Sequence, residues 1–394
     1  MPSWVGDVVM ATPTLRALRQ LDSSVNITAL VRPALQPLLA GCPWVDRIMA
    51  TAPISEGSQE RSAWRPRFAA ERVKKSIGRL RGLGLDGRQR SGRRWSVEAK
   101  DLPKRESGLV RIARRLRAEG FDTVVLLPNS FRAALLARLA RIPRRVGYDR
   151  DGRGFLLTDR LVPRRVSGRF VPVPTRDYYL ALPRYLGASN PAPAMQLFVS
   201  EEQEAKGSTM LQDAGLAANQ RLVVITPGAN FGDAKMWYPE RFAAVADRCV
   251  RELGAVVAVA GSPKERPIVD AVIDVAVEPL INLNAHGVDL GSLKSVIRRS
   301  NLVITNDTGP RHIAAALGRP VVSVFGPTDP AWTEIGFDLE RQAMVSVFCG
   351  PCQKKRCPLD HRCMTQIGPD MVFDKVDELL GMPATVGSKG WDRQ

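Results

Sequence analysis

The sequence predicts an α/β protein with parallel, doubly wound sheets, and three observations support this prediction. The apolar run Leu302–Ile304 leads through the polar turn 305–310 into a helix of small residues, the order in which an open α/β sheet forms a ligand site. From residue 221 onward, short apolar strands alternate with helical segments, which favours a parallel sheet. The chain has 394 residues, too many for one ordinary core, so two domains are expected.

The N-terminal domain is expected over residues 1–185. A linker over residues 186–200 follows, because Gly187, Pro191 and Pro193 interrupt any regular pattern. The elements expected before it are a helix near 7–20, strands near 25–31 and 46–50, a helix over 108–119, a strand over 123–127 and a helix over 131–141.

The C-terminal domain is expected over residues 201–394. Its predicted strands are apolar and rich in valine and isoleucine, as is typical of strands buried on both faces. They lie at 222–225, 256–260, 302–305 and 321–325.

The chain is strongly basic, with a net charge of +17 and an isoelectric point near 10.1. No zinc finger, RNP motif or other nucleic-acid module is recognisable, which argues against nucleic acid as the partner. Residues 55–107 hold 15 Lys/Arg against 7 Asp/Glu and so contribute +8. We interpret this segment as a basic insertion attracted to an anionic membrane surface, with an amphipathic helix near Phe68–Leu83. A merely solvated insertion is the alternative.

Neither a membrane span nor a secretory signal is predicted. There is no run of about 18 apolar residues. The N-terminus also has no basic region followed by an apolar stretch. We therefore expect a cytoplasmic protein.

Three polar segments contain the candidate functional residues. Asp307 and Thr308 precede the helix that starts at Gly309, whose N-terminus offers unpaired N–H groups and a positive dipole end. Lys235 stands in the glycine-containing loop after the strand 222–225, and a lysine there suits a diphosphate. Asp7 opens a helix near the N-terminus. The plain alternatives are a helix cap for Asp307, a surface position for Lys235 and a simple dipole-complementing charge for Asp7.

Four stretches together resemble the heptosyltransferases of glycosyltransferase family 9, the enzymes that build the inner core of lipopolysaccharide. They are SWVGDVVMATPTLRALR, LLPNSFRAALLARLARIPRRVGY, TPGANFGDAKMWYPERF and TNDTGPRHIAAALGRPVVSVFGPTDP. The motifs Pro-Ser-Trp-Val-Gly-Asp and Leu-Pro-Asn-Ser-Phe are most similar to those of the branch that adds the second heptose, heptosyltransferase II.

The resemblance implies the GT-B architecture, two Rossmann-like domains with the active site in the cleft between them. It also implies inverting, metal-independent transfer of heptose from ADP-heptose, a substrate rather than a cofactor, to a lipid A–core acceptor. We expect the enzyme on the cytoplasmic face of the inner membrane. The alternatives are the same fold with another nucleotide sugar or acceptor, or a non-catalytic, membrane-associated nucleotide-sugar-binding protein.

In this reading Asp7 is the base that deprotonates the acceptor hydroxyl, with a low pKa because it lies at a helix start. Lys235 and the N–H groups around Thr308 and Gly309 neutralise the ADP leaving group. The other donor-binding candidates are Thr226, which offers a hydroxyl; Glu265, placed to read a ribose; Asp307, holding sugar hydroxyls; and His312, contacting phosphate or supporting its loop.

Four cysteines cluster at Cys349, Cys352, Cys357 and Cys363. Their spacing falls within the range of zinc or iron–sulfur ligands, with His361 as an alternative ligand. Because similar stretches occur in the resembled family and the transfer needs no metal, we interpret them as reduced thiols framing a Cys-rich loop, 349–363. A structural metal is the alternative.

The resembled family begins with an apolar strand ahead of the Pro-Ser-Trp-Val-Gly-Asp loop, whereas this sequence begins inside that loop. We therefore expect the N-terminal sheet to lack its first strand, which would remove burial worth about 1.5–3 kcal/mol for each large apolar side chain.

Overall fold

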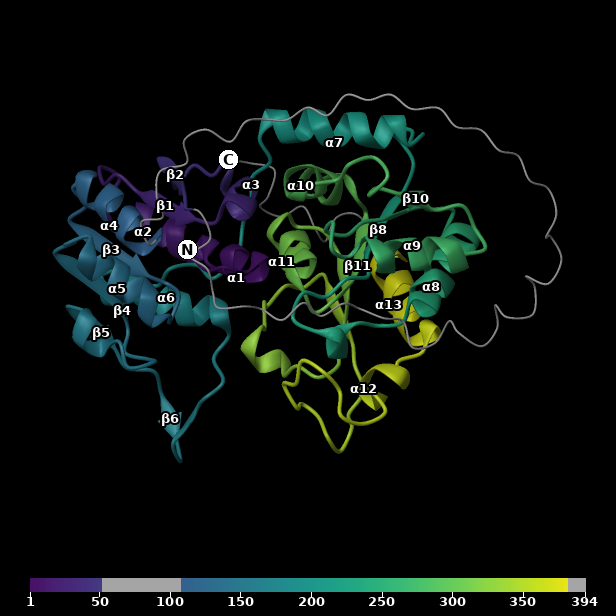
Figure 1. Ribbon diagram of the computed structural model, residues 1–394. Helices are drawn as coiled ribbons and strands as arrows, with labels where there is room; N and C mark the ends of the chain where they lie inside the picture. The colour runs from purple at the N-terminus through teal and green to yellow at the C-terminus, as the bar shows by residue number, and fades with distance from the viewer. Residues whose placement is uncertain (52–107, 382–394) are drawn as a thin grey trace, which may run out of the picture.

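The computed structural model describes residues 1–51 and 108–381. The basic insertion 55–107 and its predicted amphipathic helix lie outside them. Figure 1 shows the elements of the N-terminal half on one side and those of the C-terminal half on the other, with α1 between them.

The C-terminal half is one parallel, doubly wound sheet. Its six strands run in the order β10-β9-β8-β11-β12-β13, and all neighbours are parallel. The strands are β8 (Leu222–Thr226), β9 (Val256–Val259), β10 (Ile281–Asn282), β11 (Leu302–Asn306), β12 (Val321–Val324) and β13 (Glu340–Ala343).

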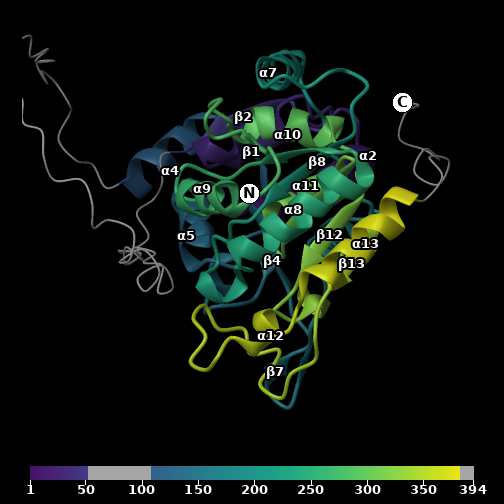
Figure 2. The ribbon, with the colours of Figure 1, turned by 90° about the vertical axis from the view of Figure 1, so that its right-hand side faces the viewer.

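Helices cover both faces of this sheet, as Figure 2 shows. The core on one side joins strand residues to α8 (Pro239–Leu253), α9 (Arg266–Val275) and α13 (Pro369–Gly381). On the other side lie α10 (Leu290–Arg299) and α11 (Gly309–Ala316), with α7 (Glu201–Asp213) packed on α10. The short α12 (Arg362–Thr365) follows the Cys-rich loop. The predicted doubly wound fold is confirmed here.

The strands described in the N-terminal half, over residues 1–51 and 108–185, form two parallel sheets and a hairpin. One sheet pairs β1 with β2, another has the order β3-β4-β5, and β6 and β7 form an antiparallel hairpin. The strands are β1 (Thr28–Val31), β2 (Arg47–Ala50), β3 (Thr123–Leu126), β4 (Arg144–Tyr148), β5 (Asp159–Leu161), β6 (Arg165–Val166) and β7 (Arg169–Phe170).

The predicted helix near 7–20 is two helices, α1 (Val5–Met10) and α2 (Thr12–Leu21). They meet at Ala11, two residues before Pro13, which lies in the first turn of α2, where a proline is tolerated because the N–H has no partner within the helix. The remaining helices on this side are α3 (Gln36–Leu39), α4 (Gly108–Ala118), α5 (Phe131–Leu139) and α6 (Thr175–Tyr185).

The amino group of Met1 donates to the carbonyl of Leu30 in β1, 2.7 Å away. Beside it the N-terminal strands divide into two sheets. This is the region in which the sequence suggested that a first strand is lacking, and that suggestion stays a prediction.

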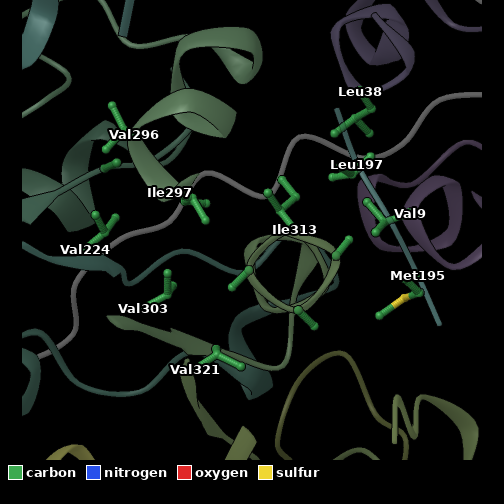
Figure 3. Close-up of a cluster of buried hydrophobic side chains, with 14 of the residues drawn as sticks. Val9, Leu38, Met195, Leu197, Val224, Val296, Ile297, Val303, Ile313 and Val321 are labelled. Carbon is green, nitrogen blue, oxygen red and sulfur yellow. The ribbon is translucent and has the colours of Figure 1, made fainter. Parts of the chain in front are cut away.

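One apolar core runs from the N-terminal helices to the C-terminal sheet (Figure 3). Val9 and Leu38 come from the N-terminal half, and Ile313 from α11. Met195 and Leu197, from the segment between α6 and α7, lie in the same core, and the Leu197 N–H donates to the Ala316 carbonyl. The predicted linker is therefore packed on the C-terminal half rather than loose, although its boundaries as a domain border stay a prediction.

Candidate functional site

The sheet order creates a topological switch point between β8 and β11. From these two central strands, the chain winds outward in opposite directions, to β9 and β10 on one side and to β12 and β13 on the other. In open α/β sheets, ligands bind beyond the carboxyl ends of the strands at such a point. The two loops that begin there carry Lys235 and Asp307, so the sheet topology itself brings the two predicted segments together.

Lys235 ends a single 3-10 turn, Asp233–Lys235, and its side chain is directed into the protein. Its Nζ donates to Oδ2 of Asp307 at 2.6 Å and to the carbonyl of the same residue at 3.0 Å. Lys235 is 8% exposed, so the alternative of a surface lysine is wrong.

Asp307 is the centre of a buried polar cluster. Besides Lys235, its carboxylate accepts from Thr328 Oγ1 at 2.8 Å, from Arg311 Nη1 at 3.4 Å and from Thr333 Oγ1 at 3.5 Å. Burial raises the pKa of Asp307, but the charges of Lys235 and Arg311 outweigh it and hold the pKa below its ordinary value. Since these partners are the side chains of four other residues and not the first N–H groups of α11, Asp307 does not act as a simple helix cap.

Asn306 ties the two loops together. Its Nδ2 donates to the carbonyl of Pro227 at 2.7 Å, and its Oδ1 accepts from the backbone N–H of Trp237 at 3.1 Å. Sequence reasoning did not single out Asn306, although it stands inside the polar turn that drew attention to Asp307. A buried amide satisfied on both sides fixes the loop spacing that the site needs.

Thr308 and Gly309 form the start of α11. Thr308 is the N-cap residue, but its hydroxyl makes no cap hydrogen bond and contacts Thr305 Oγ1 at 3.3 Å instead. The first N–H groups of a helix have no partner within the helix and carry the positive end of its dipole. An anionic group is therefore favoured at this end of α11.

Asp7 reaches the site because α1 packs unusually closely on α11. A Cβ at Gly309 would lie 2.6 Å from Val5 Cγ1, and a Cβ at Gly6 would lie 2.8 Å from His312 Cδ2. Real side chains do not come so near, so a larger residue at either position would force its neighbour to shift. This contact places Asp7, in the first turn of α1, close enough for the charge of Lys235 to act on it.

The predicted low pKa of Asp7 is wrong. Removal of the carboxylate from water raises its pKa from 3.8 to about 6, and the nearby Lys235 opposes only part of this rise. Burial outweighs the dipole of α1, which has only six residues. A base with a pKa near the working pH is the more effective kind.

His312 is buried beneath Gly6. It is 3% exposed, and its Nδ1 has no hydrogen-bond partner among the described residues. Burial and the charge of Arg311 lower the pKa of His312 to about 3, so its ring is neutral at ordinary pH. The geometry gives it a packing role under α1, and its contact with a donor stays a prediction.

Thr226 and Glu265 flank the same edge of the sheet. Thr226 is the last residue of β8, and its buried hydroxyl has no partner in the part of the chain that the structure describes. The Glu265 side chain lies against the backbone of Gly228, in the loop after β8, and its Oε2 accepts from the Ser262 N–H at 2.8 Å. The proposed contacts of Thr226 and Glu265 with a ligand stay predictions.

The Cys-rich loop supports the loop that carries Lys235. The Lys355 carbonyl accepts from the Ala234 N–H at 3.1 Å, and His361 Nε2 lies 2.8 Å from the Ala234 carbonyl. The four thiols, of Cys349, Cys352, Cys357 and Cys363, line one cavity together with this turn. Burial and the charges of the other three thiols raise the pKa of Cys363 to about 11.

In residues 1–51 and 108–381, no group of three or more His, Cys, Asp or Glu side chains is arranged to hold a metal ion. The interpretation of the four cysteines as reduced thiols stays a prediction. The contacts that join this loop to the turn of Lys235 are made by Lys355 and His361.

Two further site residues, Arg311 and Glu340, were not found from the sequence. Arg311 is fully buried and donates to Glu340 from both Nε and Nη2, at 2.5 and 2.9 Å. Arg311 stands in the noticed motif, but Glu340 opens β13, 33 residues after Asp307 along the chain, and no local pattern marks it. The cluster thus joins a carboxylate of raised pKa, a lysine, a buried ion pair and a helix N-terminus, a set that can accept a proton and stabilise a departing anion.

The sequence model of the family described as Glycosyltransferase family 9 (heptosyltransferase) matches residues 109–362, more than half of the chain. The chain is 25% identical to lipooligosaccharide heptosyltransferase 2 of Haemophilus influenzae, covering 96% of this chain and 97% of that one. It is 27% identical to lipopolysaccharide heptosyltransferase 2 of Salmonella typhimurium, with the same two coverages.

Solved structures share the fold. A glycosyl transferase family 9 protein from Veillonella parvula superposes with a TM-score of 0.72 at 22% identity, covering 96% of this chain and 95% of that one. The Escherichia coli ADP-heptose lps heptosyltransferase II superposes with a TM-score of 0.68 at 22% identity, covering 96% of both chains. These likenesses agree with two Rossmann-like domains in the GT-B arrangement.

Proposed function

Because the chain belongs to glycosyltransferase family 9, we propose that this glycosyltransferase moves heptose from ADP-heptose onto the inner core of lipopolysaccharide, in the manner of a heptosyltransferase II. The two relatives described above, each matched over 97% of its length, are named heptosyltransferase 2. The observation that carries the proposal is the meeting of Asp7, Lys235 and the N-terminus of α11 at the switch point of the sheet.

In the proposed reaction the acceptor hydroxyl loses its proton to the Asp7 carboxylate as its oxygen attacks the anomeric carbon of heptose. The bond from that carbon to the β-phosphate oxygen breaks, and ADP leaves with the electron pair. Lys235 and the first N–H groups of α11, near Thr308 and Gly309, stabilise the charge on ADP. One base and one displacement invert the anomeric configuration, and no metal takes part in these steps.

Asp307 is proposed to hold hydroxyl groups of the sugar, Glu265 the ribose and Thr226 a phosphate oxygen. Asp307 suits this role because Oδ1 makes only contacts of 3.4 Å or longer, whereas Oδ2 makes two shorter ones. A carboxylate has about four acceptor positions, so Oδ1 retains capacity for a sugar hydroxyl.

The acceptor is proposed to be a lipid A–core molecule at the cytoplasmic face of the anionic inner membrane. Among residues 1–51 and 108–381, no helix has the length and hydropathy needed to cross a bilayer. The hairpin β6–β7 supports peripheral attachment, because Arg164, Arg165 and Arg169 are exposed beside Val162 and Val166. Basic and apolar side chains together favour an anionic lipid surface.

The direct test incubates the protein with ADP-heptose and a heptose-deficient acceptor lipid and measures the mass of the lipid. We expect the gain of one heptose, and nuclear magnetic resonance of the product should show inversion at the anomeric carbon. ADP-glucose and UDP-glucose in place of ADP-heptose test donor choice. Transfer from one of these donors alone would overturn the assignment of the sugar, whereas ADP-heptose binding without any transfer would indicate a binding protein.

A further inference from the structure

Four charged side chains form a buried chain behind the proposed sugar site, in the order Lys235, Asp307, Arg311, Glu340. Their side chains are 10%, 3%, 0% and 5% exposed. The two cations and two anions balance, as buried charges must to be tolerated. The two carboxylates nonetheless differ in how closely they contact Arg311.

Arg311 is held by Glu340, and by the Thr333 carbonyl to which its Nη1 donates at 2.8 Å, rather than by Asp307. It makes two hydrogen bonds to Glu340, at 2.5 and 2.9 Å, but its contact with Asp307 is 3.4 Å long. Ser323 Oγ donates to Glu340 Oε1 at 2.8 Å and helps to fix the carboxylate. Paired, two-point contacts between arginine and a carboxylate are the strong and geometrically specific kind.

The electrostatics agree with this geometry. Burial lowers the pKa of Arg311, but the hydrogen bonds and charge of Glu340 outweigh that effect and leave the pKa above its ordinary value. Without Glu340, Arg311 would be a buried cation whose nearest carboxylate is Asp307. It would then be drawn to Oδ1, the oxygen proposed to receive a sugar hydroxyl.

We propose that Glu340 is a positioning residue for donor-sugar recognition: by holding Arg311 at two points, it prevents Arg311 from closing on Asp307 and keeps Asp307 Oδ1 free for the sugar. This inference rests on the proposed function for the role of Asp307. It assigns to the edge strand β13 a part in sugar recognition, although Glu340 is separated from the sugar by two side chains.

The test compares the binding of ADP and ADP-heptose by calorimetry in the wild type and in Glu340→Gln. ADP lacks the sugar, so we expect its dissociation constant to change by less than about 3-fold. The dissociation constant for ADP-heptose should rise about 10-fold, as expected for loss of one hydrogen bond to a charged group. In transfer assays kcat/KM should fall by about the same factor or more.

A second variant separates positioning from general support of the fold. Arg311→Met/Glu340→Gln removes the competing cation together with the carboxylate, so it should recover at least about one third of the lost preference for ADP-heptose over ADP. The exposed pair Arg341–Glu378, with Arg341 next to Glu340 on β13, supplies the control Glu378→Gln, which should match the wild type.

Three results would overturn the inference: an unchanged ratio of the two dissociation constants in Glu340→Gln, an equal loss for ADP and ADP-heptose, or no recovery in a folded double variant. Failure of the proposed function is seen separately, as a wild-type protein that does not bind or transfer heptose.

Discussion

At the scale of single residues, the site depends on how burial changes charged groups. Asp7 and Asp307 are both carboxylates at helix starts, yet their pKa values move in opposite directions. Asp307 has Lys235 and Arg311 beside it, which hold its pKa low. Asp7 is removed from water with only one cation near, which leaves its pKa at about 6. This difference favours Asp7 for the proposed proton transfer and Asp307 for the proposed sugar binding.

Asp7→Asn should lower kcat by about 100-fold or more while leaving ADP affinity nearly unchanged, because it removes the proposed base but not the proposed donor pocket. In the wild type, kcat/KM should rise with pH through about 6 and then level off. Steady-state assays over pH 5–8, with the exposed Asp374→Asn as control, check both points. A near-wild-type rate in Asp7→Asn would contradict the assignment.

The same substitution should stabilise the fold above pH 6. The native pKa of Asp7 exceeds the unfolded value of 3.8, so the native state binds this proton more tightly and loses stability as pH rises from about 4 to 6. Asp7→Asn avoids that loss and should raise the Tm by about 2 °C or more at pH 8, with little gain at pH 4. An equal shift at both pH values in thermal unfolding would count against a buried, ionised Asp7.

Lys235→Ala should lower kcat and raise the KM for the donor together, because the lysine is proposed to stabilise the leaving diphosphate. Lys235→Arg should recover only part of the activity, since a planar guanidinium does not replace a compact ammonium group. Donor-dependent kinetics check this, with Lys375→Ala on α13 as control. Full activity of Lys235→Ala would exclude Lys235 from the site.

At the scale of elements, the contact between α1 and α11 decides whether the base meets the donor loops. It connects the N-terminal half to the switch point, and it is possible only because Gly6 and Gly309 have no side chains. The helix that carries the proposed base and the helix proposed to receive the phosphate are therefore fixed to one another.

Gly309→Ala should destabilise the protein and slow transfer. The new methyl group would lie 2.6 Å from Val5 Cγ1, and overpacking of this kind costs about 1–3 kcal/mol. Relief of the clash displaces α1, so kcat should fall because alignment of the base is lost.

Val5→Ala in the same protein makes room for the methyl group and should restore most of the activity. Gly368→Ala, where a Cβ would meet nothing within 4 Å, is the control. Thermal unfolding and kcat measure both effects. A Gly309→Ala protein with unchanged Tm and kcat would mean that the contact is not required.

At the scale of the whole molecule, much of the positive charge lies outside the proposed site. The net charge is +17, of which +8 lies in residues 55–107 and the remainder elsewhere. No proposed site residue falls within that segment, and the exposed arginines of the β6–β7 hairpin add to the basic character. A basic surface suits an enzyme whose acceptor is proposed to lie in an anionic membrane.

Deletion of residues 55–107 should leave transfer to a soluble, delipidated acceptor intact. Binding to vesicles that contain anionic lipid should weaken, and the remaining binding should depend less on salt because fewer charges contribute. Vesicle sedimentation between about 50 and 300 mM salt checks this. Equal vesicle binding by the two proteins at low salt would leave the segment as a solvated insertion.

The sequence by itself determined the alternation of strands and helices, the two-part fold, the family resemblance and the loops that carry Lys235 and Asp307. These are local properties, set by apolar runs, glycine turns and the charges next to them. Even so, local pattern missed the break between α1 and α2 at Ala11, and it could not mark Glu340, which looks like any charged residue at a strand start.

Only the tertiary structure decided which charged side chains contact one another and how far each is removed from water. Lys235 and Asp307 are 72 residues apart, and their pairing follows from the adjacent positions of β8 and β11 in the sheet. The pKa of Asp7 was predicted in the wrong direction because a helix start is visible in the sequence, whereas the packing of α1 on α11 is not. Desolvation depends on all neighbours in space. It outweighed the helix dipole, the effect on the pKa that neighbours along the chain reveal.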